Sequence, residues 1–286
     1  MSASTKLTVG VIGTTGTLGG AIYKALTTQP VNVVILHRPT TKLVGVAEKQ
    51  ARTLDMGGPR PLVHKALEGI DILVNASSRT DPATDLVFLD HLASLPKPLK
   101  AYIPSDFSLN YSRDEVRGIQ FIEGKEALVS RARELGIPTT AIHNGVFESV
   151  LLTPFTGIDL VTGTLSLYPG AEDKALPITS PAYLGAAVAE IVQLETLKAH
   201  YTVLEYAATG REIGAALEKA RKKVSFETWT DEEAAALKAL GGREALSSTV
   251  RVKWGKGEWP APGEYIPKAP KRDIHDAVKH ALAKLP

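Results

Sequence analysis

The first half of the chain alternates short apolar runs with longer stretches in which apolar residues recur at helical spacing. The short runs are LTVGVI, VNVVIL, IDILVNA, KAYIPS and TTAIHNGVF. The stretches between them are long enough for crossover helices, so the pattern predicts an α/β protein with a doubly wound parallel sheet and helices on both faces.

The second half follows a different pattern, which begins after Phe147. Residues 151–177 are rich in Gly, Thr and Pro, after which SPAYLGAAVAEIVQL predicts a helix and YTVLEYA a strand. Two more helices are expected near 213–222 and 231–240, in a region that also carries all three tryptophans.

These patterns predict two domains. Residues 1–150 are expected to form the sheet domain, and 178–208 to return to it. Residues 151–177 and 209–286 are expected to form a smaller C-terminal substrate-binding lobe. The basic C-terminal segment has apolar residues at helical spacing, which favours a docked helix with a solvated basic face over a tail that seeks an anionic partner. Its apolar positions are Ile274, Val278, Ala281 and Leu282.

Composition narrows the classes of function. With 33 basic and 31 acidic side chains, the formal charge is only +2, so we expect no nucleic-acid partner. The chain has no cysteine, which excludes disulfides and thiolate chemistry and favours a reducing compartment, taken as the cytoplasm. The apolar start is too short for a signal peptide, and no apolar run reaches 18 residues, so no membrane span is expected.

The segment VIGTTGTLGG, residues 11–20, joins the first apolar run to a helical pattern. In a strand, turn and helix, Gly13 permits the tight turn, Gly16 lets a pyrophosphate approach the backbone, and Gly19 lets the helix pack on the strand. Free N–H groups and the positive end of the helix dipole then face the anion. The motif predicts a Rossmann-like dinucleotide site, with a plain glycine-rich turn as the alternative.

The second apolar run ends in His37 and Arg38, where an NAD-selecting protein usually has an acidic residue for the ribose hydroxyls. Arg38, helped by Lys42, can instead pair with the 2′-phosphate of NADP and stack on the adenine. The alternative is an ordinary exposed arginine after a strand. We therefore predict NADP(H) as the cofactor, with His37, Arg38 and Lys42 among its contacts.

Small residues end the run IDILVNASS. They suit a backbone that passes close to the cofactor, and they equally suit close packing at the end of a strand. Ala76, Ser77 and Ser78 are candidate cofactor contacts on this basis.

A lysine lies on the apolar face of the helix predicted for QFIEGKEALVSRAREL. At about 100° per residue, Lys125 falls near the middle of that face. A charged side chain that points inward is unfavourable unless it contacts a group of opposite charge or lies in a hydrated cleft. The stem of Lys125 can pack along the apolar surface or reach a buried carboxylate. Alternatively, Lys125 enters the cofactor cleft, holds the nicotinamide ribose and delivers a proton, because burial and positive neighbours lower the pKa of a lysine. The apolar face consists of Phe121, Ile122, Leu128, Val129, Ala132 and Leu135.

Together these segments resemble the NmrA-like, isoflavone-reductase-like family of the atypical short-chain dehydrogenase/reductase superfamily. GTTGTLG resembles the family's GxTGxxG, HRP places Arg38 at its NADP-directed arginine, and IPSDF resembles FPSEFG. Lys125, followed by GIPTTAIHNGVFES, resembles the lysine helix and the following GIPYTxxxxxxF strand. The matches run in order over residues 9–149, and the later half resembles the family only loosely.

The resemblance implies a role for each matched position. Lys125 would be the catalytic lysine and a cofactor contact. Asp106 replaces the family's glutamate and Ser108 its glycine, so we expect a differently shaped loop beyond the cofactor. The implied cofactor contacts are Gly13, Thr15, Gly16, Thr17, Leu18, Gly19, Arg38, Pro104, Ser105, Phe107, Asn144, Gly145 and Phe147. The expected substrate wall consists of Asp106, Phe107, Phe147, Val150, Leu151 and Tyr168.

Other catalytic arrangements are missing from the sequence. No tyrosine is followed by a lysine four positions later, so the Tyr-xxx-Lys pair of ordinary short-chain dehydrogenases is excluded. No serine stands in a GxSxG motif, and the seven histidines show no HExxH spacing. We therefore expect neither a hydrolase nor a metal site.

The expected function is that of an NADPH-dependent reductase. Hydride would go to a polarised C=C, C=O or C=N bond of a small, largely apolar or aromatic metabolite. The family resemblance implies a role in specialised biosynthesis. Cyclisation of the reduced product in the same pocket is a possible later step. The alternative is a non-catalytic NADP(H) sensor that acts through a protein partner. A sensor needs no proton donor in the cofactor cleft, so Lys125 favours the reductase over the sensor. Monomer and homodimer both remain open.

Overall fold

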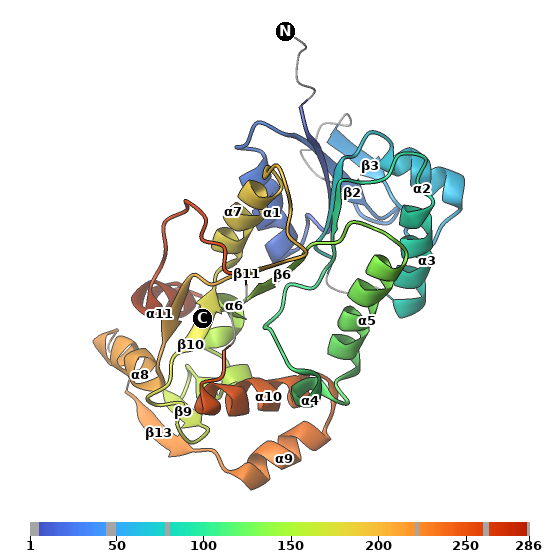
Figure 1. Cartoon of the computed structure of the whole chain (residues 1–286). Coiled ribbons are helices and arrows are strands. Elements are labelled where there is room, and N and C mark those ends of the chain that lie inside the picture. Colours follow the sequence, from blue (N-terminus) through green and yellow to red (C-terminus); the bar gives the residue numbers. More distant parts are fainter. Residues whose placement is uncertain (1–5, 44–49, 78–80, 221–222, 260–262, 285–286) are drawn as a thin grey trace. The chain divides into compact units, whose positions relative to one another are not determined.

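The computed structural model describes residues 6–43, 50–77, 81–220, 223–259 and 263–284 (Figure 1). The chain divides into two compact units, each built from segments that are separate in sequence. The first unit comprises Met1–Phe107, Gly124–Ile142 and Leu184–Tyr201, and the second comprises Ser108–Glu123, His143–Tyr183 and Thr202–Pro286.

A parallel sheet of five strands forms the centre of the first unit. The strand order is β3-β2-β1-β4-β5, and every neighbouring pair is parallel. This order reverses direction between β1 and β4, as in a doubly wound fold, and it confirms the predicted fold class. The strands are β1 (Thr8–Ile12), β2 (Asn32–His37), β3 (Ala51–Thr53), β4 (Ile72–Asn75) and β5 (Ala101–Ile103).

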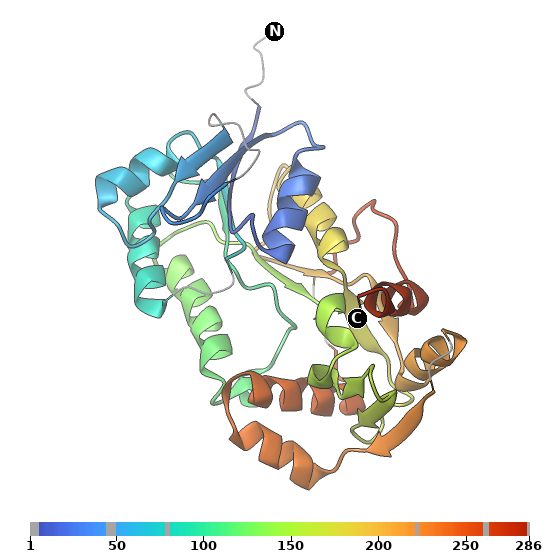
Figure 2. The same cartoon turned by 180° about the vertical axis from the view of Figure 1, so that it is seen from behind.

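Helices cover both faces of this sheet (Figures 1 and 2). One face packs against α1 (Thr17–Leu26) and the part of α7 (Pro181–Ile191) that belongs to this unit. The other packs against α2 (Arg60–Leu67), α3 (Pro82–Ala93) and the part of α5 (Gln120–Glu134) from Gly124 onward. Strand residues such as Leu73 share a buried cluster with Phe88 of α3 and Ala132 of α5. Because both faces are buried, the strands are continuously apolar.

Two runs that the sequence predicts as single strands are interrupted. TTAIHNGVF forms β6 (Ala141–Asn144) and β7 (Val146–Phe147), and the N–H of Gly145 between them donates to the Thr179 hydroxyl at 2.9 Å. YTVLEYA forms β11 (His200–Val203) and β12 (Tyr206–Ala208). Glu205 separates these two strands, because its buried carboxylate accepts backbone hydrogen bonds from Ser180 and Arg272.

The second unit contains two small sheets. In one, β10 (Leu176–Thr179) pairs in parallel with β7 and antiparallel with β12. In the other, β9 (Thr164–Leu167) lies between β8 (Ile158–Asp159) and β13 (Ser225–Thr228). A short 3₁₀ helix, Pro154–Thr156, precedes β8.

The helices of the second unit surround a core that includes Leu151, Ile178 and Trp254. The expected helices near 213–222 and 231–240 are α8 (Gly210–Lys219) and α9 (Asp231–Ala239), and the predicted C-terminal helix is α11 (Ile274–Leu282). The remaining helices are α4 (Arg113–Val116), α6 (Glu148–Leu151) and α10 (Gly242–Lys256). Within the described part of the chain, no helix has the length and apolar character needed to span a bilayer.

Helix α10 is unusual because it buries polar side chains. Arg251 is 7% exposed and stacks its guanidinium carbon 3.6 Å from the ring centroid of Trp229. Lys253 is 4% exposed and forms an ion pair of 2.5 Å with Glu115 of α4. Burial lowers the pKa of Arg251 to about 10, and the charge of Glu233 opposes that shift.

Candidate functional site

The glycine turn after β1 is closely packed in the way that a pyrophosphate cradle requires. Gly13 has φ of 88°, and a Cβ there would lie 2.6 Å from the carbonyl oxygen of Ala76. A Cβ on Gly19 would clash with the Gly13 carbonyl oxygen. Only glycine fits at these two positions, so the backbone at the carboxyl end of β1 stays open to a ligand.

The N-terminus of α1 is available to an anion. The N-cap residue is Gly16, no side chain caps this end of α1, and Thr15, Gly16 and Thr17 are exposed. Uncapped N–H groups and the positive end of the helix dipole favour phosphate at such a terminus. The cradle and the uncapped helix together fit the pyrophosphate of a dinucleotide.

The end of β2 places two cations at the same edge of the sheet. Ile12 pairs with Leu36, so the residues that follow β2 lie beside the glycine turn. Arg38 and Lys42 are exposed there, and Thr41 donates its N–H to the Arg38 carbonyl at 2.9 Å to form a turn. The Nδ1 of His37 is 3.1 Å from the Arg38 carbonyl oxygen. Two exposed cations thus follow the strand that lies beside the glycine turn.

The ends of β4 and β5 are held by a set of polar contacts. Asn75, 3% exposed, accepts hydrogen bonds from the N–H and hydroxyl of Ser77 at 3.0 and 2.6 Å. Its amide also donates to the buried Tyr102 hydroxyl, and burial raises the pKa of Tyr102 to about 12. Ser105 donates to the Ser77 carbonyl at 2.6 Å. Sequence reasoning placed Ala76 and Ser77 here but gave no role to Asn75, whose side chain holds Ser77 and contacts Tyr102 of β5.

Lys125 of α5 is half-buried in the first unit, as its position on the helix predicts. Burial lowers the pKa of Lys125 below its ordinary value of 10.5, and the charge of Asp106 acts in the opposite direction. Among the described residues, no hydrogen bond to the Lys125 ammonium is found. Asp106 is itself 6% exposed. Phe121, expected on the inward face, is instead 44% exposed.

Most of the expected cofactor contacts belong to one unit. The first unit holds those from Gly13 to Ser77, together with Pro104, Ser105, Phe107 and Lys125, and the carboxyl edge of its sheet brings the glycine turn and the ends of β2, β4 and β5 together. Ser78 lies outside the described residues. Pro104 and Phe107 are buried, and the Asp106 N–H donates to the Pro104 carbonyl at 2.8 Å, which forms a tight turn after β5.

Asn144, Gly145 and Phe147 belong to the second unit. Gly145 lies against β10, where a Cβ would be 2.6 Å from the Pro177 backbone. Asn144 is 2% exposed, and its Oδ1 has no hydrogen-bond partner within the described part of the chain. Phe147 is half-exposed at the end of β7.

The expected substrate-wall residues of the second unit differ in their environments. Val150 is half-buried against the apolar core, whereas Leu151 is fully buried within it. The Leu151 side chain therefore offers no surface to a ligand in this structure. Tyr168 donates its hydroxyl to Asp231 at 2.6 Å and packs its ring edge against Trp229, which holds it beside α9.

A buried charged cluster follows Phe147 and was not anticipated from the sequence. Arg272 bonds one oxygen of Glu148 at 2.8 Å, and the other oxygen of Glu148 is buried without a partner among the described residues. The Tyr206 hydroxyl is likewise buried, and burial together with the charges of Glu148 and Glu205 raises its pKa. No sequence signal marked this cluster, because Glu148, Tyr206 and Arg272 are more than fifty residues apart from one another along the chain.

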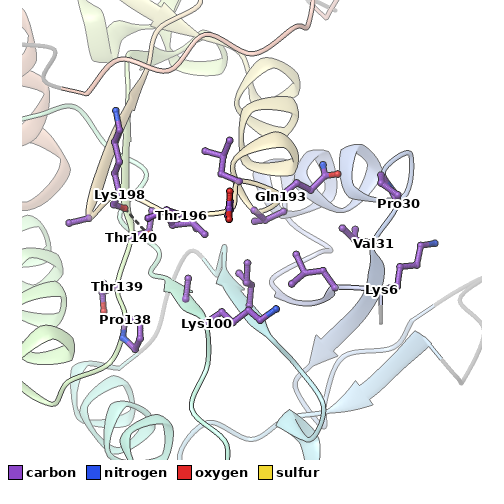
Figure 3. Close-up of a pocket in the computed structure, with 18 residues that line it drawn as sticks. Lys6, Pro30, Val31, Lys100, Pro138, Thr139, Thr140, Gln193, Thr196 and Lys198 are labelled. Atoms are coloured by element: carbon purple, nitrogen blue, oxygen red, sulfur yellow. Dashed lines mark hydrogen bonds between the residues drawn. The ribbon is translucent and has the colours of Figure 1, made fainter. Parts of the chain in front are cut away.

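A hollow of about 960 Å³ lies at the opposite edge of the first unit's sheet. It is lined by residues that precede β1 and β5, such as Lys6 and Lys100, and by the segment after α7 that includes Gln193 and Lys198 (Figure 3). The Thr140 hydroxyl donates to the Lys198 carbonyl along one wall. Because the hollow is at the amino ends of the strands, it is separate from the glycine cradle.

The described residues contain no group of three or more His, Cys, Asp or Glu side chains able to hold a metal ion. The amino-acid sequence matches no protein-family model and no curated protein sequence. Identification of similar proteins therefore depends on the three-dimensional structure.

The fold is shared with solved reductase structures. An isoflavone reductase crystal structure superposes with a TM-score of 0.79 at 15% identity, covering 97% of this chain and 100% of that chain. The leucoanthocyanidin reductase–NADPH complex from Vitis vinifera gives 0.77 at 16% identity, with 97% and 100% coverage. An NADPH-dependent quinone oxidoreductase from Escherichia coli, complexed with NADPH, gives 0.67 at 17% identity, with 96% and 99% coverage. The resemblance to isoflavone-reductase-like proteins is thus confirmed at the level of the fold.

Proposed function

We propose that this protein is an NADPH-dependent reductase of the isoflavone-reductase-like type. Its acceptor is a polarised C=C, C=O or C=N bond in a small, largely apolar or aromatic metabolite, and its setting is specialised metabolism. The half-buried Lys125, whose pKa burial lowers, carries this proposal. The glycine cradle in the same unit supplies the dinucleotide site.

The cofactor assignment is supported by the fit of the cradle to a phosphorylated dinucleotide. Gly13 and Gly19 leave the backbone open, and the uncapped α1 terminus presents N–H groups. Arg38 offers a guanidinium at the same sheet edge, with no acidic residue at the end of β2 to accept the ribose hydroxyls of NAD. Two of the structurally similar proteins were solved with NADPH.

The chemical role of each group follows from its environment. NADPH, when bound, supplies the hydride. Lys125 holds a proton at Nζ, and burial makes that proton easier to donate than in an exposed lysine. The negative charge of Asp106 favours the protonated, charged form of Lys125 and so opposes loss of the proton.

The test begins with the purified full chain and two cofactors. We expect NADPH to bind more tightly than NADH in a titration followed by calorimetry. A panel of quinones, enones and iminium ions is then screened for acceptor-dependent loss of NADPH absorbance. Equal affinity for NADPH and NADH would contradict the role of Arg38.

An NADP(H) sensor predicts a different result in the same screen. Such a protein would bind NADPH, turn over none of the acceptors, and capture a protein partner in only one redox state of the cofactor. Tight NADPH binding with turnover of any acceptor class contradicts the sensor and supports the reductase.

A further inference from the structure

The strand β13 is the exposed edge of the sheet β13-β9-β8 in the second unit (Figure 1). Among the described strands it pairs only with β9, in parallel, and all four of its residues are exposed. The unpaired N–H and C=O groups of an edge strand can accept a strand from another chain.

The hydrogen bonds to β9 determine which backbone groups remain free. Ser225 donates its N–H to the Gly163 carbonyl, and Trp229 donates to the Leu167 carbonyl. Backbone groups alternate in direction along a strand, so those of Phe226 and Thr228 point to the outer edge. An added strand would therefore bond to the even-numbered residues of β13.

The side chains around β13 have opposite charges at symmetric positions. Lys223 and Glu227 lie two residues before and two residues after Ser225, both are exposed, and neither forms an ion pair with any described residue. Alternation places these two side chains on one face, and Val224 and Phe226 on the other. On that second face the Phe226 ring packs over α8, where a Cβ on Gly214 would be 2.6 Å from it.

We propose that β13 is a dimerisation strand, which pairs antiparallel with β13 of a second copy of this chain about a two-fold axis at Ser225. In this register Lys223 faces Glu227 of the second copy twice, once on each side of the axis. Lys223 and Glu227 of the two copies form non-hydrogen-bonded pairs, in which opposing side chains come closest. Phe226 faces Val224 of the second copy on the other face.

The charges favour this register over the one in which the two-fold axis is moved by one residue, to Phe226. An axis at Phe226 would also bond the even-numbered residues, but it would place Ser225 opposite Glu227 and Lys223 opposite Trp229, without an opposite-charge pair. Charged residues on an edge strand usually prevent association. Here, pairing about Ser225 makes them complementary instead, so the edge favours a copy of itself. A self-complementary two-fold contact is the usual form of a homodimer.

The strand is short, so we expect a weak dimer that is visible only at raised concentration. Sedimentation equilibrium of the full chain, from about 1 µM to about 1 mM, measures the dissociation constant. Lys223→Glu and Glu227→Lys each place like charges opposite one another, and each is expected to weaken the dimer by about tenfold or more. The double variant restores opposite charges and is expected to recover most of the affinity.

Glu195→Lys is the matched control, because it makes the same charge reversal at an exposed residue of the first unit. It should dimerise like the wild type. Hydrogen exchange supplies a second measurement: the amides of Val224 and Phe226, which pair with each other across the axis, should exchange more slowly at high concentration, whereas the already bonded Ser225 amide should change little.

The proposal is overturned if the chain stays monomeric throughout the concentration range. It is also overturned if a dimer forms that neither single reversal weakens, or if the double variant remains as weak as the single ones. Circular dichroism of each variant confirms folding, so loss of the dimer can be separated from loss of structure. None of these measurements depends on cofactor binding or turnover.

Discussion

Two inward-facing lysines, one in each unit, have opposite electrostatic environments. Lys253 of α10 is 4% exposed and its ammonium is 2.5 Å from the Glu115 carboxylate. The same carboxylate accepts the N–H of Ser112, and the Trp259 ring lies 5.6 Å from the Lys253 ammonium. Lys125 of α5 is half-buried, has no hydrogen bond to a described residue, and its pKa is lowered by burial.

The difference separates a structural lysine, Lys253, from Lys125, the proton donor of the proposed function. A buried lysine in contact with a carboxylate holds two elements together, as Lys253 holds α10 to α4 through Glu115. A buried cation without such a contact loses its proton more readily, which is unfavourable for folding but useful for proton transfer. Burial alone therefore does not identify a catalytic lysine. The absence of a carboxylate in contact with the lysine, among the described residues, is more informative than burial.

Replacing Lys125 is the strongest test of this distinction. Lys125→Met keeps the stem and removes the proton donor, so turnover should fall by about 10²- to 10⁴-fold, with the free energy of unfolding unchanged or raised. Steady-state kinetics and urea denaturation measure the two effects. Lys65→Met, an exposed lysine of α2, is the control. Normal turnover in Lys125→Met would remove its catalytic role.

Lys253 should respond in the opposite way. Lys253→Met leaves the Glu115 carboxylate without its cation, and we expect a loss of about 2 kcal/mol in unfolding free energy, less than for a fully buried pair because Glu115 is 26% exposed. Turnover per folded molecule should change little. Adding Glu115→Gln should recover part of the lost stability. A loss of turnover without a loss of stability would place Lys253 in the chemistry.

An exposed cation, Arg38, extends the comparison to binding. Removing its guanidinium in Arg38→Ala should weaken NADPH binding by about 10- to 100-fold and leave NADH binding and stability nearly unchanged. Calorimetric titration of both cofactors checks this. Arg60→Ala, an exposed arginine of α2, should bind both as the wild type does.

Asp106 should set the pH at which Lys125 loses its proton. The Asp106 charge raises the pKa of Lys125 against the effect of burial, so Asp106→Asn should lower that pKa further. Because the proposed donor works when protonated, activity falls as pH rises through its pKa. The alkaline limb of the turnover profile should therefore move to lower pH. Asp90→Asn, exposed on α3, should leave the limb in place.

The Glu115–Lys253 pair predicts a small acid sensitivity. Burial acts to raise the pKa of Glu115, but the hydrogen bonds from Lys253 and Ser112 lower it overall below 4.5. A lowered carboxylate pKa stabilises the fold above the unfolded value and loses that stabilisation as pH falls through the folded value. Urea denaturation at neutral and acid pH should show less loss for Glu115→Gln than for the wild type. An equal loss would assign the acid sensitivity to other groups.

The first unit was the more predictable from sequence, because its signals are local. The glycine turn lies between β1 and α1 within a few residues, and continuous apolar runs mark strands buried on both faces. β3 was missed because Ala51–Thr53 is only three residues long. Its Arg52 side chain bonds the carbonyls of Ala66 and Glu68, a tertiary contact that no local pattern records.

The second unit was less predictable because tertiary contacts decide its structure. Helix α10 was not anticipated, since Ser248, Arg251 and Lys253 are buried by partners distant in sequence and hide the apolar face. Glu205 and Gly145 interrupt expected strands for the same reason. For the candidate site, the sequence predicted Lys125 and the glycine turn, and these assignments stay predictions. Only the structure shows that Lys125 has no carboxylate contact among the described residues of the kind that Lys253 has.

The stacking of Arg251 on Trp229 has a practical consequence for following the protein in solution. Trp229, Trp254 and Trp259 are the chain's three tryptophans, and all belong to the second unit. Indole emission is therefore an optical signal of that unit alone, sensitive to the loss of a guanidinium 3.6 Å from one ring. Far-ultraviolet dichroism, by contrast, receives contributions from both units. Denaturation curves that coincide in the two signals would indicate one cooperative unfolding event, and separated curves would indicate two.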